Sequence, residues 1–173
     1  MARDILKTLK TEHDLVRGLF DELKQTTDRA TRKRSDLLAK IKKNLMPHAK
    51  WEEIVFYPAF KERADRDGLQ THAEAVEEHR AVEQTVIPDV NSADVGTPQF
   101  AGRAKVFGEL VDHHASEEET TMFKMARKMF DARERADFDV QYEEWKQSPA
   151  AANAVAGAEA KAAVKAVVRK VLG

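Results

Sequence analysis

Two segments of the chain combine a histidine with a glutamate four residues later, His48 with Glu52 and His114 with Glu118. Residues i and i+4 lie one above the other on the same face of an α-helix, so each pair can hold one cation. Both pairs lie on apolar stripes of helical period, namely Leu38, Ile41, Leu45, His48, Glu52, Val55 and Phe107, Val111, His114, Glu118, Met122, Met125, Met129. A glutamate inside such a stripe is costly unless it is paired or binds a metal. The spacing therefore indicates a buried metal site.

Two further histidines repeat this arrangement. The interval from His48 to His114 is the same as the interval from His13 to His79, since 114 − 48 equals 79 − 13. Both His13 and His79 follow a glutamate and lie on apolar stripes, namely Leu6, Leu9, His13, Val16, Phe20, Leu23 and Leu69, His72, Val76, His79, Val82, Val86. The chain therefore consists of two helical hairpins, each with two inward histidines.

A single histidine on an apolar face is more often a hydrogen-bonded core residue than a metal ligand. A metal-free helical interaction module would carry its histidines in that way. Four histidines at matching positions, together with two buried glutamates, favour metal binding instead.

Other polar residues near these motifs fit the site less well. His113 and Glu117 share the same spacing, but their stripe becomes polar. His72 is two turns before His79, about 10 Å away along the axis, which is too far for the same ion. We expect three neighbouring glutamates to form a solvated flank, namely Glu53, Glu117 and Glu119.

The residues present restrict the metal chemistry. The chain has no cysteine, which excludes disulfides, iron–sulfur clusters and thiolate zinc sites. Nitrogen and oxygen ligands suit iron, manganese or zinc. Four histidines and two glutamates are too many for one tetrahedral zinc, and carboxylates from facing helices can bridge two ions. We predict a two-metal centre with six ligands, namely His13, His48, Glu52, His79, His114 and Glu118.

Length and composition indicate one helical domain. The chain has 173 residues, long enough for a substantial core, and its 7 Gly and 5 Pro suit helices with short connections. A formal net charge of −1 gives no reason to expect nucleic-acid binding. No run approaches the roughly 18 apolar residues of a membrane span, and the N-terminus lacks the apolar core of a secretory signal. We therefore expect a cytoplasmic protein.

Periodicity and turn residues predict five helices. Four long helices form two hairpins separated by a turn at 65–68, and a short fifth helix follows. The expected ranges are 3–27, 31–63, 69–87, 98–130 and 131–147. Pro88 should end the third helix, because helices usually end before a proline. The metal-binding bundle is expected to span residues 1–147.

Residues 148–173 form an alanine- and lysine-rich tail that could be helical or disordered. Steps of four place Lys161, Lys165 and Arg169 on one face, which is the pattern of a basic amphipathic helix. Gly157 weakens such a helix. We expect a solvated, partly frayed tail rather than contact with a membrane or nucleic acid.

In combination, these motifs resemble the hemerythrin-like, or HHE cation-binding, domain family. The resemblance rests on residues 12–23, 56–58, 78–80 and 113–114 together with His48, Glu52 and Glu118, and it covers about residues 5–126. It implies an all-α, up-down-up-down four-helix bundle around a non-haem di-iron centre. It also implies terminal histidine ligands and bridging glutamates. The metals would be two iron ions joined by an oxo or hydroxo bridge, in preference to manganese or zinc.

The sequence departs from the oxygen-carrying members of that family at two positions. The resemblance would place another ligand one turn before His79, where this chain has Ala75, and an aspartate where it has Glu119. It therefore implies a protein that binds, senses or reacts with dioxygen, peroxide or nitric oxide rather than a reversible carrier. A catalase-like activity is one such reaction. The alternative is an iron-handling or storage protein without turnover.

Overall fold

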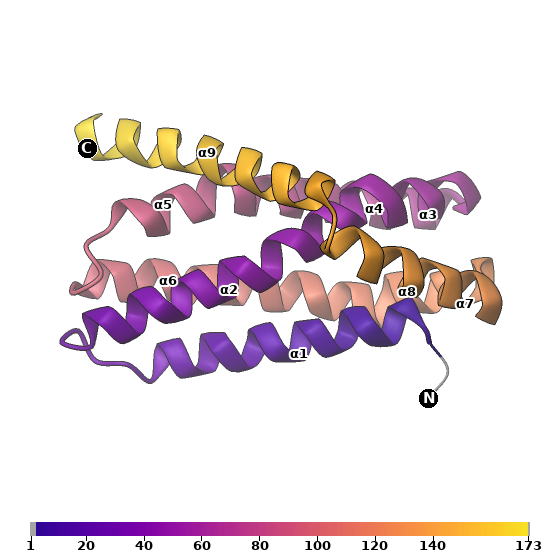
Figure 1. Ribbon diagram of the computed structural model, residues 1–173, viewed down its shortest axis with the longest axis horizontal. Coiled ribbons are helices and arrows are strands. Elements are labelled where there is room, and N and C mark those ends of the chain that lie inside the picture. The colour runs from indigo at the N-terminus through magenta and orange to yellow at the C-terminus, as the bar shows by residue number, and fades with distance from the viewer. Residues whose placement is uncertain (1–2, 173) are drawn as a thin grey trace.

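Four long helical stretches run side by side and alternate in direction in the computed structural model, which describes residues 3–172 and the side chains of 3–168 (Figure 1). The first hairpin contains α1 (Ile5–Lys24), α2 (Thr31–Trp51), η1 (Glu52–Phe56) and α3 (Tyr57–Arg63). The second contains α4 (Arg66–Ala81), η2 (Val82–Val86), α5 (Ile87–Ser92), α6 (Pro98–Glu117), η3 (Glu118–Met122) and α7 (Phe123–Met129). Two more helices follow, α8 (Ala132–Lys146) and α9 (Pro149–Leu172). The predicted all-α, up-down-up-down bundle is confirmed.

Polar side chains fix where several of these helices begin. They accept hydrogen bonds from free backbone N–H groups in the first turn, and they are Asp4, Asp65, Thr97 and Asp131. Asp131 and Glu134 also form a reciprocal capping box at the start of α8. The predicted helix ranges therefore agree with the structure to within a few residues, apart from the third.

The third helical stretch continues through Pro88 to Ser92, so the predicted end at Ile87 is wrong. The π-helical turn η2 ends at Val86, just before Ile87 and this proline, and the Ile87 N–H bonds to the carbonyl of Val82. A proline normally clashes with the carbonyl four residues earlier. The wider turn displaces that carbonyl, and the helix continues. Pro58 follows η1 in the same way.

Among the described residues, the buried apolar side chains form two clusters. One is rich in aromatic residues and includes Trp51, Phe56, Phe60, Phe123 and Phe130. The other is mainly aliphatic and includes Leu37, Ile41, Ile87, Val90 and Val111. Along α1 and α2, a histidine separates the residues of one cluster from those of the other. The histidines therefore lie in the middle of the bundle, between two apolar regions.

The C-terminal tail is the helix α9, which packs against α2 and α5 (Figure 1). Its buried face consists of alanines at helical spacing, Ala151, Ala158, Ala162 and Ala166. Small side chains allow close helix contact, and Ala158 and Ala162 join the aliphatic cluster. The expectation of a solvated tail is therefore wrong for the described part of α9, while Arg169 lies outside the described side chains.

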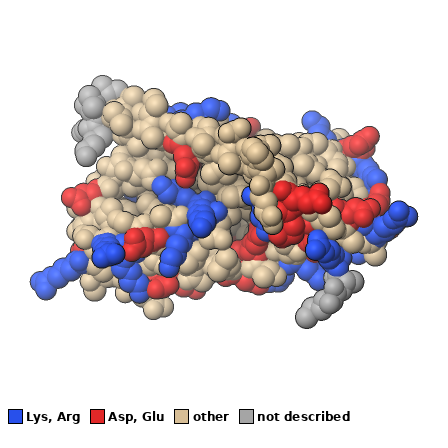
Figure 2. Space-filling view, viewed as in Figure 1, with Lys and Arg blue, Asp and Glu red and all other residues tan. Residues whose placement is uncertain are grey.

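The surface differs along the molecule. On the face shown in Figure 2, basic and acidic side chains are mixed over much of the bundle, whereas the surface along α9 is largely uncharged. Val164, Val167 and Val168 contribute exposed apolar surface there. Within the described residues, no helix is both long and apolar enough to cross a membrane.

Candidate metal centre

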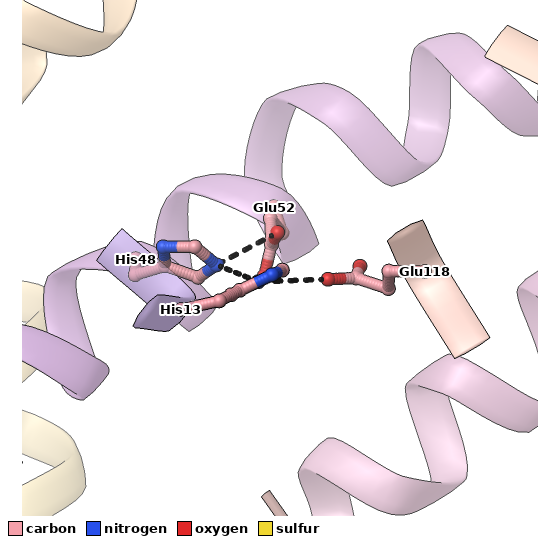
Figure 3. A group of neighbouring side chains, drawn as sticks. All are labelled: His13, His48, Glu52 and Glu118. Carbon is pink, nitrogen blue, oxygen red and sulfur yellow. Dashed lines mark hydrogen bonds and ion pairs between the residues drawn. The ribbon is translucent and has the colours of Figure 1, made fainter. Parts of the chain in front are cut away.

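Each of the four bundle helices places one histidine at the centre of the molecule. His13 and His48 form one pair, with 3.1 Å between their Nε2 atoms (Figure 3). His79 and His114 form the second pair, with 2.9 Å between their Nε2 atoms. The structure therefore brings all four predicted histidines together, each with Nε2 facing inward.

In each of these four histidines, the second ring nitrogen, Nδ1, contacts a carboxylate of another helix. Nδ1 lies 3.0 Å from Glu119 in His13, 2.9 Å from Glu12 in His48, 3.1 Å from Glu53 in His79 and 2.6 Å from Glu78 in His114. In a neutral imidazole that donates its Nδ1–H, Nε2 is an acceptor. Outer carboxylates of this kind orient histidines that ligate metals.

Sequence reasoning missed these four carboxylates. Glu53 and Glu119 were expected to be solvated, but each contacts a buried histidine, so that expectation is wrong for both. The signal was present in the repeat, because Glu12 and Glu78 are separated by the same interval as His13 and His79, and so are Glu53 and Glu119. Both hairpins therefore repeat the outer partners as well as the histidines.

The two buried glutamates lie between the histidine pairs. Glu52 has one oxygen 3.1 Å from His48 Nε2 and the other 3.6 Å from His79 Nε2. Glu118 Oε2 lies 3.3 Å from His13 Nε2 and 3.6 Å from His114 Nε2. Each glutamate therefore contacts one histidine of each pair, and Figure 3 shows the contacts of Glu52 with His48 and of Glu118 with His13.

Both of these glutamates are the first residues of π-helical turns, Glu52 of η1 and Glu118 of η3. A π turn inserts one residue into the helix and changes the direction of the side chains that follow, and such turns are frequent at functional sites. The interval between the two turns is also that of the histidine repeat, since 118 − 52 equals 114 − 48. The two hairpins thus share the same π-helical backbone at Glu52 and at Glu118, in addition to the same residue types.

Three oxygens of these glutamates are buried without a hydrogen bond, both oxygens of Glu52 and Oε2 of Glu118. The nearest groups are the Nε2 atoms, which accept and cannot donate when the imidazoles are neutral, so a site with neutral imidazoles leaves these oxygens unpaired. Two atoms that are each about 2.1 Å from one ion lie about 3.0 Å apart at a right angle, close to the separations within each histidine pair. These nitrogen and oxygen atoms therefore fit metal ions well.

The local charges also favour a cation. Burial alone would lower the pKa of His48, but the charges of Glu52 and Glu12 raise it to about 10. Burial likewise opposes protonation of His114, yet Glu118, Glu78 and Glu52 raise its pKa to about 8. Burial would raise the pKa of Glu118, but the neighbouring histidines lower it well below its usual range. Without metal, His48 and His114 therefore hold protons, because the carboxylates attract positive charge.

Tyr57 distinguishes the two histidine pairs. Its hydroxyl donates a hydrogen bond to Glu118 Oε1 at 2.7 Å, and it lies 3.2 Å from His79 Nε2 and 3.3 Å from His114 Nε2. Burial and the nearby glutamates raise the pKa of Tyr57, so the hydroxyl keeps its proton when no metal is bound. The corresponding residue of the repeat is Phe123, whose ring stacks 6.0 Å from that of His13. The two hairpins therefore do not provide identical surroundings.

The fifth helix, α8, covers the His48 side of the centre. Tyr142 donates a hydrogen bond of 2.5 Å to one oxygen of Glu12, and Lys146 donates one of 2.9 Å to the other. Burial would raise the pKa of Glu12, but hydrogen bonds from His48, Tyr142 and Lys146 lower it to about 2. This carboxylate therefore remains charged and fixes the orientation of the His48 ring.

The two remaining histidines lie outside the central group. The ring of His72 is 6.1 Å from that of Tyr57. The side chain of His113 is 59% exposed, and its Nε2 lies 3.5 Å from both Glu78 and Glu117. The structure thus places His114, and not His113, beside the inward Nε2 atoms.

The described residues line a small cavity beside the histidines and a larger one away from them. A small one of about 40 Å³ is lined by His79 and His114, by their partners Glu53 and Glu78, and by Lys50. A larger one of about 550 Å³ lies between α1 and α6, and none of the four histidines lines it. The small cavity is therefore the one that adjoins the centre, at His79 and His114.

Comparison with known proteins agrees with this geometry. The family model of the hemerythrin HHE cation-binding domain matches residues 4–126. The chain belongs to this family. A crystal structure of an HHE cation-binding domain-containing protein from Mycobacterium kansasii has the same fold, with a TM-score of 0.69 and 20% identity over 88% of this chain and 97% of the other.

A curated relative of this HHE domain protein is a DNA nickase from Nostoc sp. (strain PCC 7120 / SAG 25.82 / UTEX 2576). The two are 29% identical over 125 residues, which is 72% of this chain but 34% of the nickase. The chain thus spans about a third of the relative's length. Family membership and the buried His/Glu cluster together show a metal-binding domain.

Proposed function

We propose that this HHE domain is a non-haem di-iron protein that binds, senses or reacts with dioxygen, peroxide or nitric oxide. The observation that carries the proposal is the set of three buried carboxylate oxygens of Glu52 and Glu118 that have no hydrogen bond, on glutamates that lie between two pairs of inward Nε2 atoms. A single ion would use only part of this set. Iron accepts imidazole and carboxylate ligands together, and the chain has no thiolate that would favour a softer metal.

The proposed ligands divide naturally into two positions. His13 and His48 would hold one ion, and His79 and His114 the other. Glu52 and Glu118 would bridge the two ions, a role supported by their contacts with one histidine from each pair. The four outer carboxylates would remain on Nδ1 and keep each imidazole in the tautomer that presents Nε2.

When bound, the iron pair would supply the redox chemistry that the side chains lack. The protein itself determines the shape of the site and excludes water from it. The aromatic and aliphatic clusters exclude water from both ends of the centre. The Tyr57 hydroxyl donates to Glu118 at 2.7 Å and so holds a proton beside His79 and His114.

The small cavity beside His79 and His114 supports a small reactant. Its volume of about 40 Å³ exceeds the minimum for one water molecule, roughly 10–15 Å³ on a comparable measure. Lys50 lines it and forms ion pairs with Glu53 and Glu83, joining helices on both sides. A diatomic molecule or peroxide fits such a space, whereas a bulky substrate does not.

The similarity to the nickase leads to no proposal of DNA cleavage. The matched region is about a third of that protein, and DNA nicking is an activity of the whole relative. On the face in Figure 2, basic side chains alternate with acidic ones and form no continuous basic surface. We therefore propose small molecules as the reactants.

The test is elemental analysis of protein produced with iron in excess, followed by assays of peroxide turnover and dioxygen uptake. Wild-type protein should contain close to two irons per chain. Glu118→Ala should lose both ions together, because one bridging ligand serves both positions. Glu109→Ala, an exposed glutamate on the same helix, should retain them.

Two results would contradict the proposal. One zinc per chain under these conditions would exclude the di-iron centre. A full metal content in Glu118→Ala would exclude the bridging role. Two irons without any reaction toward peroxide, dioxygen or nitric oxide would instead identify an iron-handling protein without turnover.

A further inference from the structure

Three side chains outside the buried centre form a second group with metal-ligating chemistry. Glu78 of α4 and His113 and Glu117 of α6 place one ligand atom each within 4.8 Å of the others. His113 Nε2 lies 3.5 Å from Glu78 Oε1 and 3.5 Å from Glu117 Oε1. These separations are too long for strong hydrogen bonds. They are close to the roughly 3.4 Å between two ligand atoms at a tetrahedral angle around one ion.

This group is open to solvent. The side chains of His113 and Glu117 are 59% and 42% exposed, and that of Glu78 is 23% exposed. One imidazole and two carboxylates suit a divalent first-row transition cation, with remaining positions free for water. A cation can therefore bind here without unfolding any part of the bundle.

The same group contacts the buried centre directly through Glu78. One oxygen of Glu78 faces His113, and the other lies 2.6 Å from Nδ1 of His114. His113 and Glu117 of α6 each precede a member of the buried pair by one residue in the sequence, since His114 follows His113 and Glu118, the first residue of η3, follows Glu117. The helix therefore carries two histidine–glutamate pairs in register, one facing solvent and one facing the core.

The first hairpin has no counterpart to this group. In the histidine repeat, the residue equivalent to His113 is Pro47 and the residue equivalent to Glu117 is Trp51. Neither of these residues ligates metals. The counterpart of Glu78 is Glu12, which is held by Tyr142 and Lys146 of α8. The outer site is thus an addition on one side of an otherwise repeated centre.

We propose that Glu78, His113 and Glu117 form an exposed site for a divalent transition cation, and that this site loads the buried centre. Cations would bind first at His113 and Glu117 and then transfer past the shared Glu78 to the His79 and His114 side. The loading role rests on the proposed di-metal function, whereas binding at the exposed site does not.

Zinc titration of the iron-loaded chain, in competition with a chromophoric chelator, tests the exposed site. Wild type should bind one zinc beyond its iron, and iron analysis afterwards should show that no iron was displaced. His113→Ala/Glu117→Gln should bind that zinc at least tenfold more weakly. The control Lys105→Ala/Glu109→Gln removes another i, i+4 pair from the same helix, with exposures of 58% and 60%, and should behave as wild type. Equal zinc binding by the His113 variant would overturn the site.

Iron uptake tests the loading role. Metal-free wild type and both double variants are mixed with Fe(II) without oxygen, and bound iron is measured over time after quenching with a chelator. The His113 variant should take up iron several-fold more slowly but reach the same final content. Equal rates would overturn the loading role. If wild type took up no iron, the di-iron function would fail, while the difference in zinc binding between the metal-free wild type and the His113→Ala/Glu117→Gln variant would still report on the exposed site.

Discussion

Tyr57 and Phe123 occupy equivalent positions of the repeat but give the two histidine pairs different surroundings. The hydroxyl of Tyr57 lies within 3.3 Å of both Nε2 atoms of its pair and adjoins the His79 and His114 side of the centre. At the other pair, the ring of Phe123 offers only an apolar surface. A reactant that uses the small cavity therefore meets the pair that has a proton donor.

Replacing Tyr57 with Phe should separate metal binding from reactivity. The variant keeps all six proposed ligands, so we expect a full metal content. Loss of a buried hydrogen bond to a charged group should lower the free energy of unfolding by about 1–3 kcal/mol. The peroxide reaction rate and the visible spectrum should also change, because the hydroxyl contacts Glu118 and both Nε2 atoms.

Tyr142→Phe is the matched control for that variant, since it also removes a buried hydroxyl that donates to a glutamate. Its stability should fall by a similar amount, with a smaller change in the reaction rate. If Tyr57→Phe left both the spectrum and the rate unchanged, the asymmetry between the two histidine pairs would have no functional consequence.

At the residue scale, the sequence predicted the inward group well and its outer partners poorly. His48 and Glu52 lie among apolar residues, so their burial follows from the helical period. Glu53 and Glu119 adjoin the solvated face in sequence, and a helical pattern alone describes them as surface residues. Their role depends on where a different helix places its histidine, and this information belongs to the packing of the bundle.

The helices can be predicted from the sequence wherever neighbouring residues, such as a cap or an apolar stripe, determine the backbone conformation. The apolar stripes and the cap at Thr97 were sufficient to locate the bundle helices, whereas Asp65, predicted to lie in a turn, caps a helix that begins at Arg66 rather than at Leu69. The π turns were not predictable, because the choice between an i−4 and an i−5 acceptor is made by packing around Glu52, Val82 and Glu118. Pro88 was misread for the same reason.

The helix α9 was misread because alanine carries little hydrophobic signal. Ala158, Ala162 and Ala166 recur at steps of four, but their side chains are small, and the neighbouring lysines dominate the pattern. Ala158 and Ala162 stabilise the fold by packing against the larger apolar residues of the aliphatic cluster. Close approach of a helix, rather than large side chains, accounts for the burial.

Removing residues 148–173 should leave a folded bundle that is less stable, in line with the expected boundary at residue 147. Loss of α9 exposes part of the aliphatic cluster, and each buried methylene group is worth about 0.8 kcal/mol. We expect a decrease of a few kcal/mol in the free energy of unfolding by urea, with the metal content unchanged.

The control for this truncation is Val164→Ser/Val167→Ser, which alters two exposed side chains of α9. Its stability should stay within about 0.5 kcal/mol of wild type. Unchanged stability after truncation would show that α9 does not pack in solution. Loss of metal would show that the functional unit extends beyond residue 147.

For the whole molecule, stability and metal binding are coupled through the charge of the centre. Four imidazoles are surrounded by six carboxylates, namely Glu12, Glu52, Glu53, Glu78, Glu118 and Glu119. Either protons or metal ions can supply the positive charge that this group requires. Metal binding therefore competes with protons and weakens as pH falls.

Metal removal should destabilise the protein to an extent that depends on pH. In the metal-free chain, the folded pKa values of His48 and His114 are raised to about 10 and about 8, from 6.5. Their stabilising effect is fully present below pH 6.5 and is lost as pH rises through those folded values. Glu12, with a folded pKa lowered to about 2, stabilises above its usual 4.5 and loses this effect in acid.

We therefore expect the metal-free protein to melt at lower temperature at pH 9 than at pH 6, whereas the iron-loaded protein changes much less. The melting-temperature difference between loaded and chelated protein should grow with pH, because metal replaces the protons that the histidines lose. Thermal melts at pH 6, 7.5 and 9, with and without chelator, measure this difference. A difference that stays constant or shrinks as pH rises would contradict the view that protons and metal ions compete for the inward Nε2 atoms.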